Sequence, residues 1–181
     1  MSKRQIELVI LCEDKQQQVF IRQFLTARGI PPQKMRFRAV PHGKQAGEQY
    51  VRQTFAQEVK THRAEVTYRA SIRLVAMLDA DIYSIQQRLQ HLDTELENVG
   101  QVKRQSDEKI AVFIPKRNIE TWIHYLMGQE VDEATAYAKF NHESNCKPYI
   151  ENLAQNICPV GLPLNAPPSL HHACDELKRI L

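Results

Sequence analysis

The chain has 181 residues, of which 43% are hydrophobic and 25% are charged, with a formal net charge of +3. This composition is typical of a folded globular protein and excludes a largely disordered one, and the length predicts one domain with a small extension. The net charge is too small to indicate a partner, and no apolar run approaches the roughly 18 residues of a membrane span.

The first 127 residues alternate short apolar runs with amphipathic segments, which is typical of an α/β sheet. Residues 6–12 (IELVILC) form a nearly continuous apolar run, as expected for a strand covered on both faces. Residues 14–29 then carry apolar side chains at helical spacing, and Gly29 ends this helix. The next expected elements are a strand at 35–40, a helix from 45 to about 62 and a strand at 74–78.

The second half of the chain continues this pattern and then changes. Apolar residues recur every three or four positions from Ile82 to Val99, and Gly100 ends that helix. A fourth strand is expected at 109–115, and a helix capped by Asn118 follows it. From Gly128 onward, prolines divide the chain into short pieces, with helices expected at 149–158 and 169–181. We therefore predict a parallel four-stranded sheet flanked by helices at 1–127 and a helical extension packed on it at 128–181.

Charged residues follow the predicted strands at the points where the strands end. They are Glu13 and Asp14 after the first strand, Lys44 after the second, Asp79 and Asp81 after the third, and Lys116, Arg117 and Glu120 after the fourth. The carboxyl ends of parallel strands meet at one edge of a sheet, and ligands bind there. We therefore expect these side chains to gather at one edge.

The spacing of the two aspartates indicates a cation site. Side chains two residues apart in an extended strand point to the same side, so Asp79 and Asp81 would repel each other. A divalent cation removes that repulsion, and Mg²⁺ takes one or two carboxylates together with waters and phosphate oxygens. Glu13 would be a further ligand or a proton-transfer group, and Lys116, Arg117 and Lys44 would contact phosphate.

Structural roles explain several of these residues equally well. Asp81 could cap a helix that begins at Ile82, and Glu13, Asp14 and Glu120 could be first-turn residues favoured by the helix dipole. Lys116 and Arg117 could be an ordinary solvated pair. The hypothesis of a site depends on the coincidence of so many charged groups at the ends of successive strands.

These segments resemble the topoisomerase-primase (Toprim) domain family. The matching pieces are LVILCEDKQ, LVAMLDADI and AVFIPKRNIETWI, which cover the family's glutamate after the first strand and its Asp-x-Asp after the third. Glu120 and Trp122 match a Glu-x-Trp of small stand-alone Toprim proteins, whereas Asp14 stands where the family commonly has glycine. The resemblance covers about residues 5–127.

The resemblance implies a nuclease that depends on Mg²⁺ or Mn²⁺ and hydrolyses phosphodiester bonds. Glu13, Asp79 and Asp81 would be catalytic and would bind the metal together with Glu120. The substrate would be a nucleic acid, and the protein would act as an antiphage-defence effector with a partner ATPase.

Three other interpretations stay open. In a response-regulator receiver domain, Asp79 would accept a phosphoryl group beside Glu13, Asp14 and Lys116. A Toprim-like module without catalysis would bind a partner or nucleic acid through Arg63, Arg69 and Arg73. A zinc site would draw its ligands from the extension, namely His142, Cys146, Cys158, His171, His172 and Cys174.

The cellular location is predicted from the cysteines and the start of the chain. Four cysteines lie far apart, without a CxxC pair, and an acidic segment follows the first apolar run. Both features favour reduced thiols in the cytoplasm and no association with a membrane.

Overall fold

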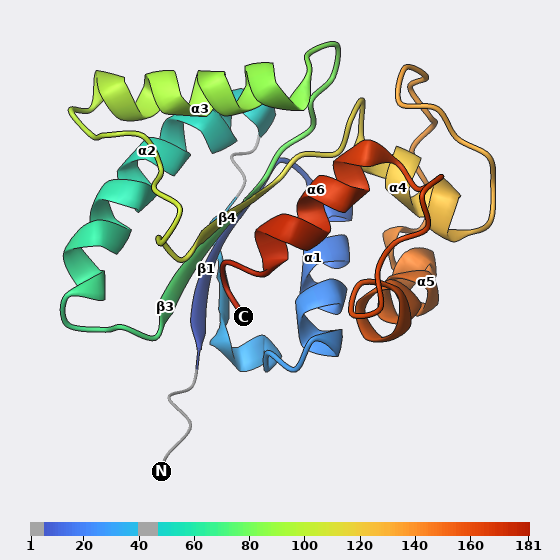
Figure 1. Ribbon diagram of the computed structural model, residues 1–181, viewed down its shortest axis with the longest axis horizontal. Coiled ribbons are helices and arrows are strands. Elements are labelled where there is room, and N and C mark those ends of the chain that lie inside the picture. Colours follow the sequence, from blue (N-terminus) through green and yellow to red (C-terminus); the bar gives the residue numbers. More distant parts are fainter. Residues whose placement is uncertain (1–5, 40–46) are drawn as a thin grey trace.

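A four-stranded sheet separates two layers of helices in the computed structural model, which describes residues 6–39 and 47–181 (Figure 1). All neighbouring strands are parallel, and their order is β2-β1-β3-β4. This confirms the predicted fold class of a parallel four-stranded α/β sheet flanked by helices. The strands are β1 (Glu7–Cys12), β2 (Met35–Phe37), β3 (Ile72–Met77) and β4 (Ile110–Phe113).

The central strands are apolar on both faces because helices cover both faces. In β1, Leu8 and Ile10 belong to the core on the side of α1, whereas Val9 and Leu11 belong to the core on the side of α2 and α3. Such strands lack the apolar-polar alternation of a half-exposed sheet, as their sequence indicated. The helices of these two layers are α1 (Lys15–Ala27), α2 (Gly47–Val66) and α3 (Ile85–Asn98).

Side-chain caps set the starts of α1 and α3 at the carboxyl edge of the sheet. Asp14 is the N-cap of α1 and accepts a hydrogen bond from the Gln17 amide at 2.9 Å, so the expectation that Glu13 and Asp14 lie in the first turn is wrong, whereas Glu120 does lie in the first turn of its helix. Asp81 does not cap α3, because Ser84 caps that helix in a reciprocal pair with Gln87. Asn118 occupies the N-cap position of α4 (Ile119–Leu126), but its side chain makes no capping hydrogen bond.

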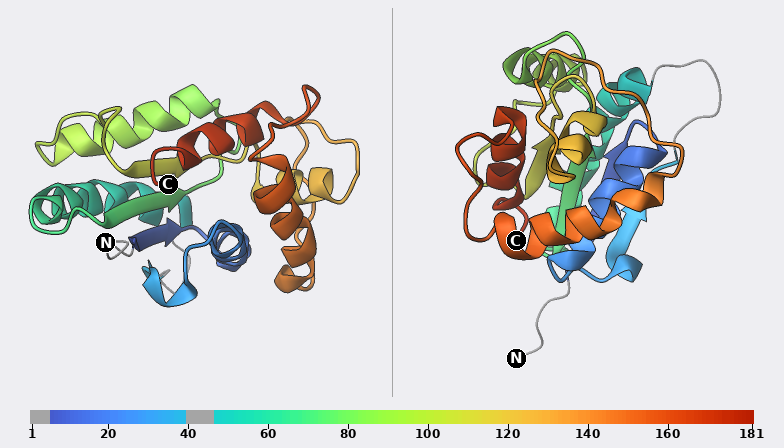
Figure 2. Two further views of the ribbon diagram at one scale, coloured as in Figure 1. Left: turned by 60° about the horizontal axis from the view of Figure 1, so that its bottom comes forward. Right: turned by 90° about the vertical axis from the view of Figure 1, so that its right-hand side faces the viewer.

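The extension packs on the α1 side of the sheet (Figure 2). The Trp122 indole donates to Ser169 Oγ at 2.7 Å, and Glu176 accepts from the Val112 amide of β4 at 2.8 Å. Both contacts join the last helix to the first 127 residues. The extension contains α5 (Lys147–Asn152), a π-helical turn (Leu153–Ile157) and α6 (Pro168–Leu177).

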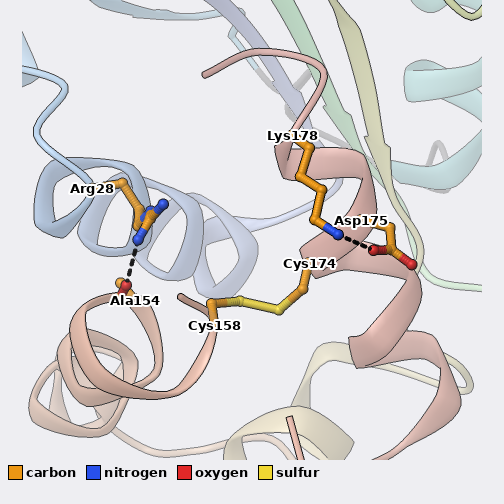
Figure 3. The surroundings of a disulfide bond; sticks show 6 residues. All are labelled: Arg28, Ala154, Cys158, Cys174, Asp175 and Lys178. Atoms are coloured by element: carbon orange, nitrogen blue, oxygen red, sulfur yellow. Dashed lines mark hydrogen bonds and ion pairs between the residues drawn. A yellow bond between two sulfur atoms is a disulfide. The ribbon is translucent and has the colours of Figure 1, made fainter. Parts of the chain in front are cut away.

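A disulfide between Cys158 and Cys174 joins the end of the π-helical turn to α6 (Figure 3). The expectation that all four thiols are free is therefore wrong for this pair, although Cys12 and Cys146 are free and buried. The zinc interpretation loses these two thiols as ligands. Among residues 6–39 and 47–181, no group of three or more histidine, cysteine or acidic side chains is arranged to hold a metal ion.

Within those same ranges, no helix has the length and apolar character needed to cross a membrane.

Candidate active site

The charged residues predicted from the strand ends lie at the carboxyl edge of the sheet. The chain pairs β1 with β2 on one side and with β3 on the other, so the strand order reverses between β1 and β3. Glu13 directly follows β1, and Asp79 lies two residues beyond β3. The two carboxylates therefore sit at the crevice where ligands bind in sheets of this kind.

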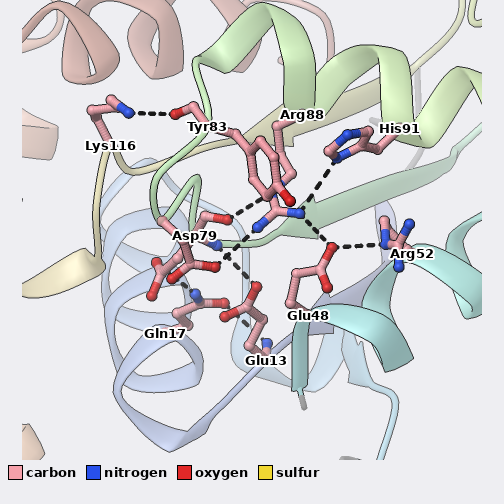
Figure 4. Close-up of polar contacts among 10 residues, drawn as sticks. Glu13, Gln17, Glu48, Arg52, Asp79, Tyr83, Arg88, His91 and Lys116 are labelled. Carbon is pink, nitrogen blue, oxygen red and sulfur yellow. Dashed lines mark hydrogen bonds and ion pairs between the residues drawn. The ribbon is translucent and has the colours of Figure 1, made fainter.

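Glu13 and Asp79 are joined by one direct hydrogen bond and by a bridge through Gln17 (Figure 4). The Asp79 amide donates to Glu13 Oε1 at 3.0 Å. Gln17, in the first turn of α1, connects both residues because its Nε2 donates to Asp79 Oδ1 at 2.9 Å and its Oε1 accepts from the Glu13 amide at 3.0 Å. Residues that are 66 positions apart in the sequence thus form one cluster.

Asp81 points to a different partner. Its Oδ2 accepts from Nη2 of Arg88 at 2.9 Å, while Nε of Arg88 donates to the Asp79 carbonyl at 3.0 Å. Nη1 of Arg88 pairs with Glu48, and the guanidinium lies over the Tyr83 ring, 4.9 Å from its centroid. Arg88 is 3% exposed and thus lies buried among these groups.

The backbone explains why the two aspartates separate. The chain stays extended to Ala80, whose amide donates to the Pro115 carbonyl at 2.8 Å. Asp81 then takes a φ of 52°, in the left-handed region, and its amide donates to the carbonyl of Arg117, whose φ is 66°. The expectation that both carboxylates point to the same side therefore fails, because the alternation of an extended strand ends at Ala80.

Burial and mutual repulsion favour the protonated forms of the clustered acids. Burial, with repulsion from Asp81, raises the pKa of Glu13 to about 8, although the Asp79 amide opposes the shift. Burial also raises the pKa of Asp79 well above its ordinary value, and the charge of Glu13 adds to the effect. Both carboxyl groups can therefore exchange a proton, and a bound cation would stabilise their ionised forms.

Glu120 lies beside this cluster without direct contact to it. Its side chain is 1% exposed, and Oε1 has no hydrogen-bond partner in the described part of the chain. Burial raises the pKa of Glu120, and repulsion from Asp14 adds to the shift. Lys139 of the extension places its ammonium group 3.4 Å from Asp14 Oδ2. The extension thus supplies a cation at this edge, which sequence reasoning did not identify.

The predicted phosphate-binding residues have fewer contacts that fix their side chains than the acidic residues have. Nζ of Lys116 donates to the Tyr83 carbonyl, which keeps the ammonium beside the Asp79–Asp81 turn. Within residues 6–39 and 47–181, the Arg117 side chain forms no ion pair. The backbone of Arg117 pairs with that of Asp81 in an isolated antiparallel bridge. Lys44 lies outside the described residues.

Three residues of the cluster were missed by sequence reasoning: Gln17, Glu48 and Arg88. Gln17 lies in a polar run at the start of a helix, and Arg88 lies on a helix that reads as amphipathic. The one available signal for Arg88 is its position four residues beyond Ser84, in the first turn of a helix that follows the aspartates. Polar residues at such positions are ordinarily solvated, so sequence alone gave no reason to select them.

The arginines of the proposed basic strip are engaged in intramolecular contacts. Arg63 pairs with Glu108, and Arg69 pairs with Glu7. Arg73 donates to the carbonyl of Ala70 at 2.7 Å. They therefore do not form a row of free cations.

No family model matches the chain, and no curated protein or solved structure matches it either. The resemblance to Toprim domains thus stays a prediction from the three segments that carry it.

Proposed function

We propose that the chain is a nuclease that hydrolyses phosphodiester bonds with the help of Mg²⁺ or Mn²⁺. The observation that supports this most directly is the hydrogen-bonded pair of Glu13 and Asp79 at the crevice between β1 and β3. The Asp79 carboxylate is buried and the Glu13 charge raises its pKa further, so this pair of acids is costly unless a proton or a cation compensates their charge. The Asp-x-Asp and Glu-x-Trp segments of the Toprim resemblance fall at the same edge.

The side chains fit a hard divalent cation. Every candidate ligand is a carboxylate oxygen, which suits Mg²⁺ and Mn²⁺ better than a soft metal. Glu13 and Asp79 would supply the protein ligands, and a pair suffices because Mg²⁺ commonly keeps several waters. The unpartnered Oε1 of buried Glu120 would accept from one of those waters.

A bound cation would polarise a phosphoryl oxygen and make an attached water more acidic. In its ionised form, and through an oxygen that does not bind the cation, Glu13 would accept the proton of the attacking water, because its surroundings raise its pKa to about 8 and so make it a stronger base than an ordinary glutamate. Lys116 and Arg117 would neutralise phosphate charge from the neighbouring turn. The partner ATPase and the antiphage role are supported by the resemblance alone.

The test is cleavage of single- and double-stranded DNA and RNA with Mg²⁺, Mn²⁺ or EDTA. We expect cleavage by the wild type only with a cation, and a loss of about 100-fold or more in Glu13→Gln and Asp79→Asn, as for removal of a catalytic acid or base. Asp175→Asn is the matched control, because Asp175 lies in an exposed ion pair on α6.

Stability measurements separate this function from a purely structural role. Asp79→Asn retains an oxygen for Gln17 and cannot ionise within the buried cluster, so its melting temperature should stay at or above that of the wild type. Equal cleavage rates in Asp79→Asn and wild type would refute the proposed catalytic role, as would the absence of cleavage by the wild type on all four substrates.

A further inference from the structure

We propose that Arg88 is the resident counter-ion of the acidic cluster, and that a divalent cation binds by taking over Asp81 from Arg88. This role depends on the proposed function, since it concerns the same cation. It adds a residue and a conformational step: Asp81 exchanges one positive partner for another, and Arg88 stays in place.

Arg88 is built into the site as a buried cation. Its side chain is 3% exposed, and its guanidinium contacts the Asp79 carbonyl, the Asp81 carboxylate and the Glu48 carboxylate. A buried charge without partners is unfavourable, whereas here all three nitrogens of the guanidinium have an acceptor. The position of Arg88 is therefore specified by the fold.

The contacts of Arg88 divide into a fixed part and an exchangeable part. Nε holds the backbone of the turn at Asp79, and Nη1 holds Glu48 at the start of α2. Only Nη2 holds the side chain of Asp81, which is 57% exposed, compared with 17% for Glu48. Asp81 can thus rotate without disturbing the core, and Arg88 then keeps Glu48 as a counter-ion.

This arrangement explains why the three predicted acids do not converge. The Glu13 carboxylate accepts from the Asp79 amide, but the carboxylate of Asp81 is turned to Arg88. A cation beside Glu13 and Asp79 would repel the Arg88 guanidinium and attract Asp81. Exchange of Asp81 from Nη2 to the cation would bring the third carboxylate to the site.

The first experiment measures the affinity for Mn²⁺ by calorimetry in wild type, Arg88→Gln and Arg52→Gln. Arg52 is the matched control, because its Nε lies 2.7 Å from the same Glu48 carboxylate and it forms its other ion pair with Glu95. We expect Arg88→Gln to bind Mn²⁺ about tenfold more tightly, since a competing positive charge is removed. Arg52→Gln should stay within about twofold of the wild type, because Arg52 pairs with Glu48 and Glu95 and not with Asp81.

The outcomes distinguish this role from the proposed function. If the wild type binds Mn²⁺ and Arg88→Gln binds it equally or more weakly, the exchange is refuted while the metal site stands. If neither protein binds Mn²⁺, both the exchange and the metal-dependent function are refuted.

A second measurement uses the wild type alone, so it does not depend on the folding of a variant. Nuclear magnetic resonance of the arginine side chains, with Arg88 assigned by the signals lost in Arg88→Lys, follows a titration with Mg²⁺. We expect the Nη signals of Arg88 to shift as Asp81 leaves, while its Nε signal stays near its starting position because the bond to the Asp79 carbonyl persists. Unchanged Nη signals at saturating Mg²⁺ would overturn the proposal.

Discussion

Glu13 shows how position within the fold changes an ordinary side chain. It follows the last residue of β1, and the Asp79 amide donates to its carboxylate. Burial nevertheless dominates and raises its pKa to about 8. From the sequence, Glu13 could be selected because it follows an apolar strand, but its proton affinity depends on Asp79 and Asp81, which approach it only in the fold.

The raised pKa of Glu13 predicts how stability changes with pH. The folded state retains a proton that the unfolded state releases, so the contribution of Glu13 is complete below pH of about 4.5 and is lost as the pH rises through about 8. The raised pKa of Asp79 acts in the same direction. In EDTA, the free energy of unfolding of the wild type should therefore fall relative to that of Glu13→Gln as the pH rises from about 5 to about 8.

Denaturant titrations of the two proteins at several pH values measure this difference. A difference that is constant across the range would contradict a raised pKa in the folded state. Mn²⁺ should increase the melting temperature more at pH of about 8 than at about 5.5, because protons compete with the cation for the same oxygens.

At the scale of the elements, periodic segments were predicted well and their junctions less well. The apolar runs gave β1, β3 and β4, and helical spacing gave α1 and α3, because burial on a defined face dictates these patterns. The start of α3 was misplaced at Ile82. Ser84 caps the helix in place of Asp81, because the left-handed turn at Asp81 comes before the helix begins.

The first residue of α2 is held by a close approach that no periodicity reveals. A Cβ added at Gly47 would lie 2.5 Å from the Glu13 carbonyl oxygen, so the helix packs directly on the loop after β1. Gly47→Ala would ordinarily favour a helix. Here we expect a loss of about 1–3 kcal/mol in the free energy of unfolding, as for other overpacked sites.

Denaturant unfolding of Gly47→Ala tests this contact. Gln49→Ala, at an exposed position in the same turn, should stay within about 0.5 kcal/mol of the wild type. A stabilised Gly47→Ala variant would show that α2 does not rest on the Glu13 carbonyl.

At the scale of the whole molecule, the fold class could be predicted from the sequence, whereas the closure of the acidic cluster could not. Parallel pairing follows from the alternation of strands and helices, and it brings the strand ends together, whereas the strand order is known only from the structure. The contacts of Gln17 and Arg88 depend on packing between elements, and a single polar residue in a helix does not indicate which element it will contact. The same reason hid the pairing of Cys158 with Cys174, which are 16 residues apart and have no recognisable motif.

The disulfide predicts that the stability of the protein depends on redox conditions. Closing a loop of 16 residues stabilises a fold by about 3 kcal/mol, mainly through the entropy of the unfolded chain. We expect dithiothreitol to lower the free energy of unfolding of the wild type by about that amount. The double variant Cys158→Ser and Cys174→Ser should unfold like the reduced wild type and should not respond to dithiothreitol; an equal response in both proteins would contradict the assignment.

The backbone bridge between Asp81 and Arg117 limits how the lengths of two loops can vary among related sequences. The loops that follow β3 and β4 meet through it, and both residues adopt left-handed backbone angles at the meeting point. An inserted or deleted residue in either loop would misalign the other, so their lengths are coupled. Variation in loop length is expected instead at the opposite edge of the sheet, for example in the polar connection between α3 and β4.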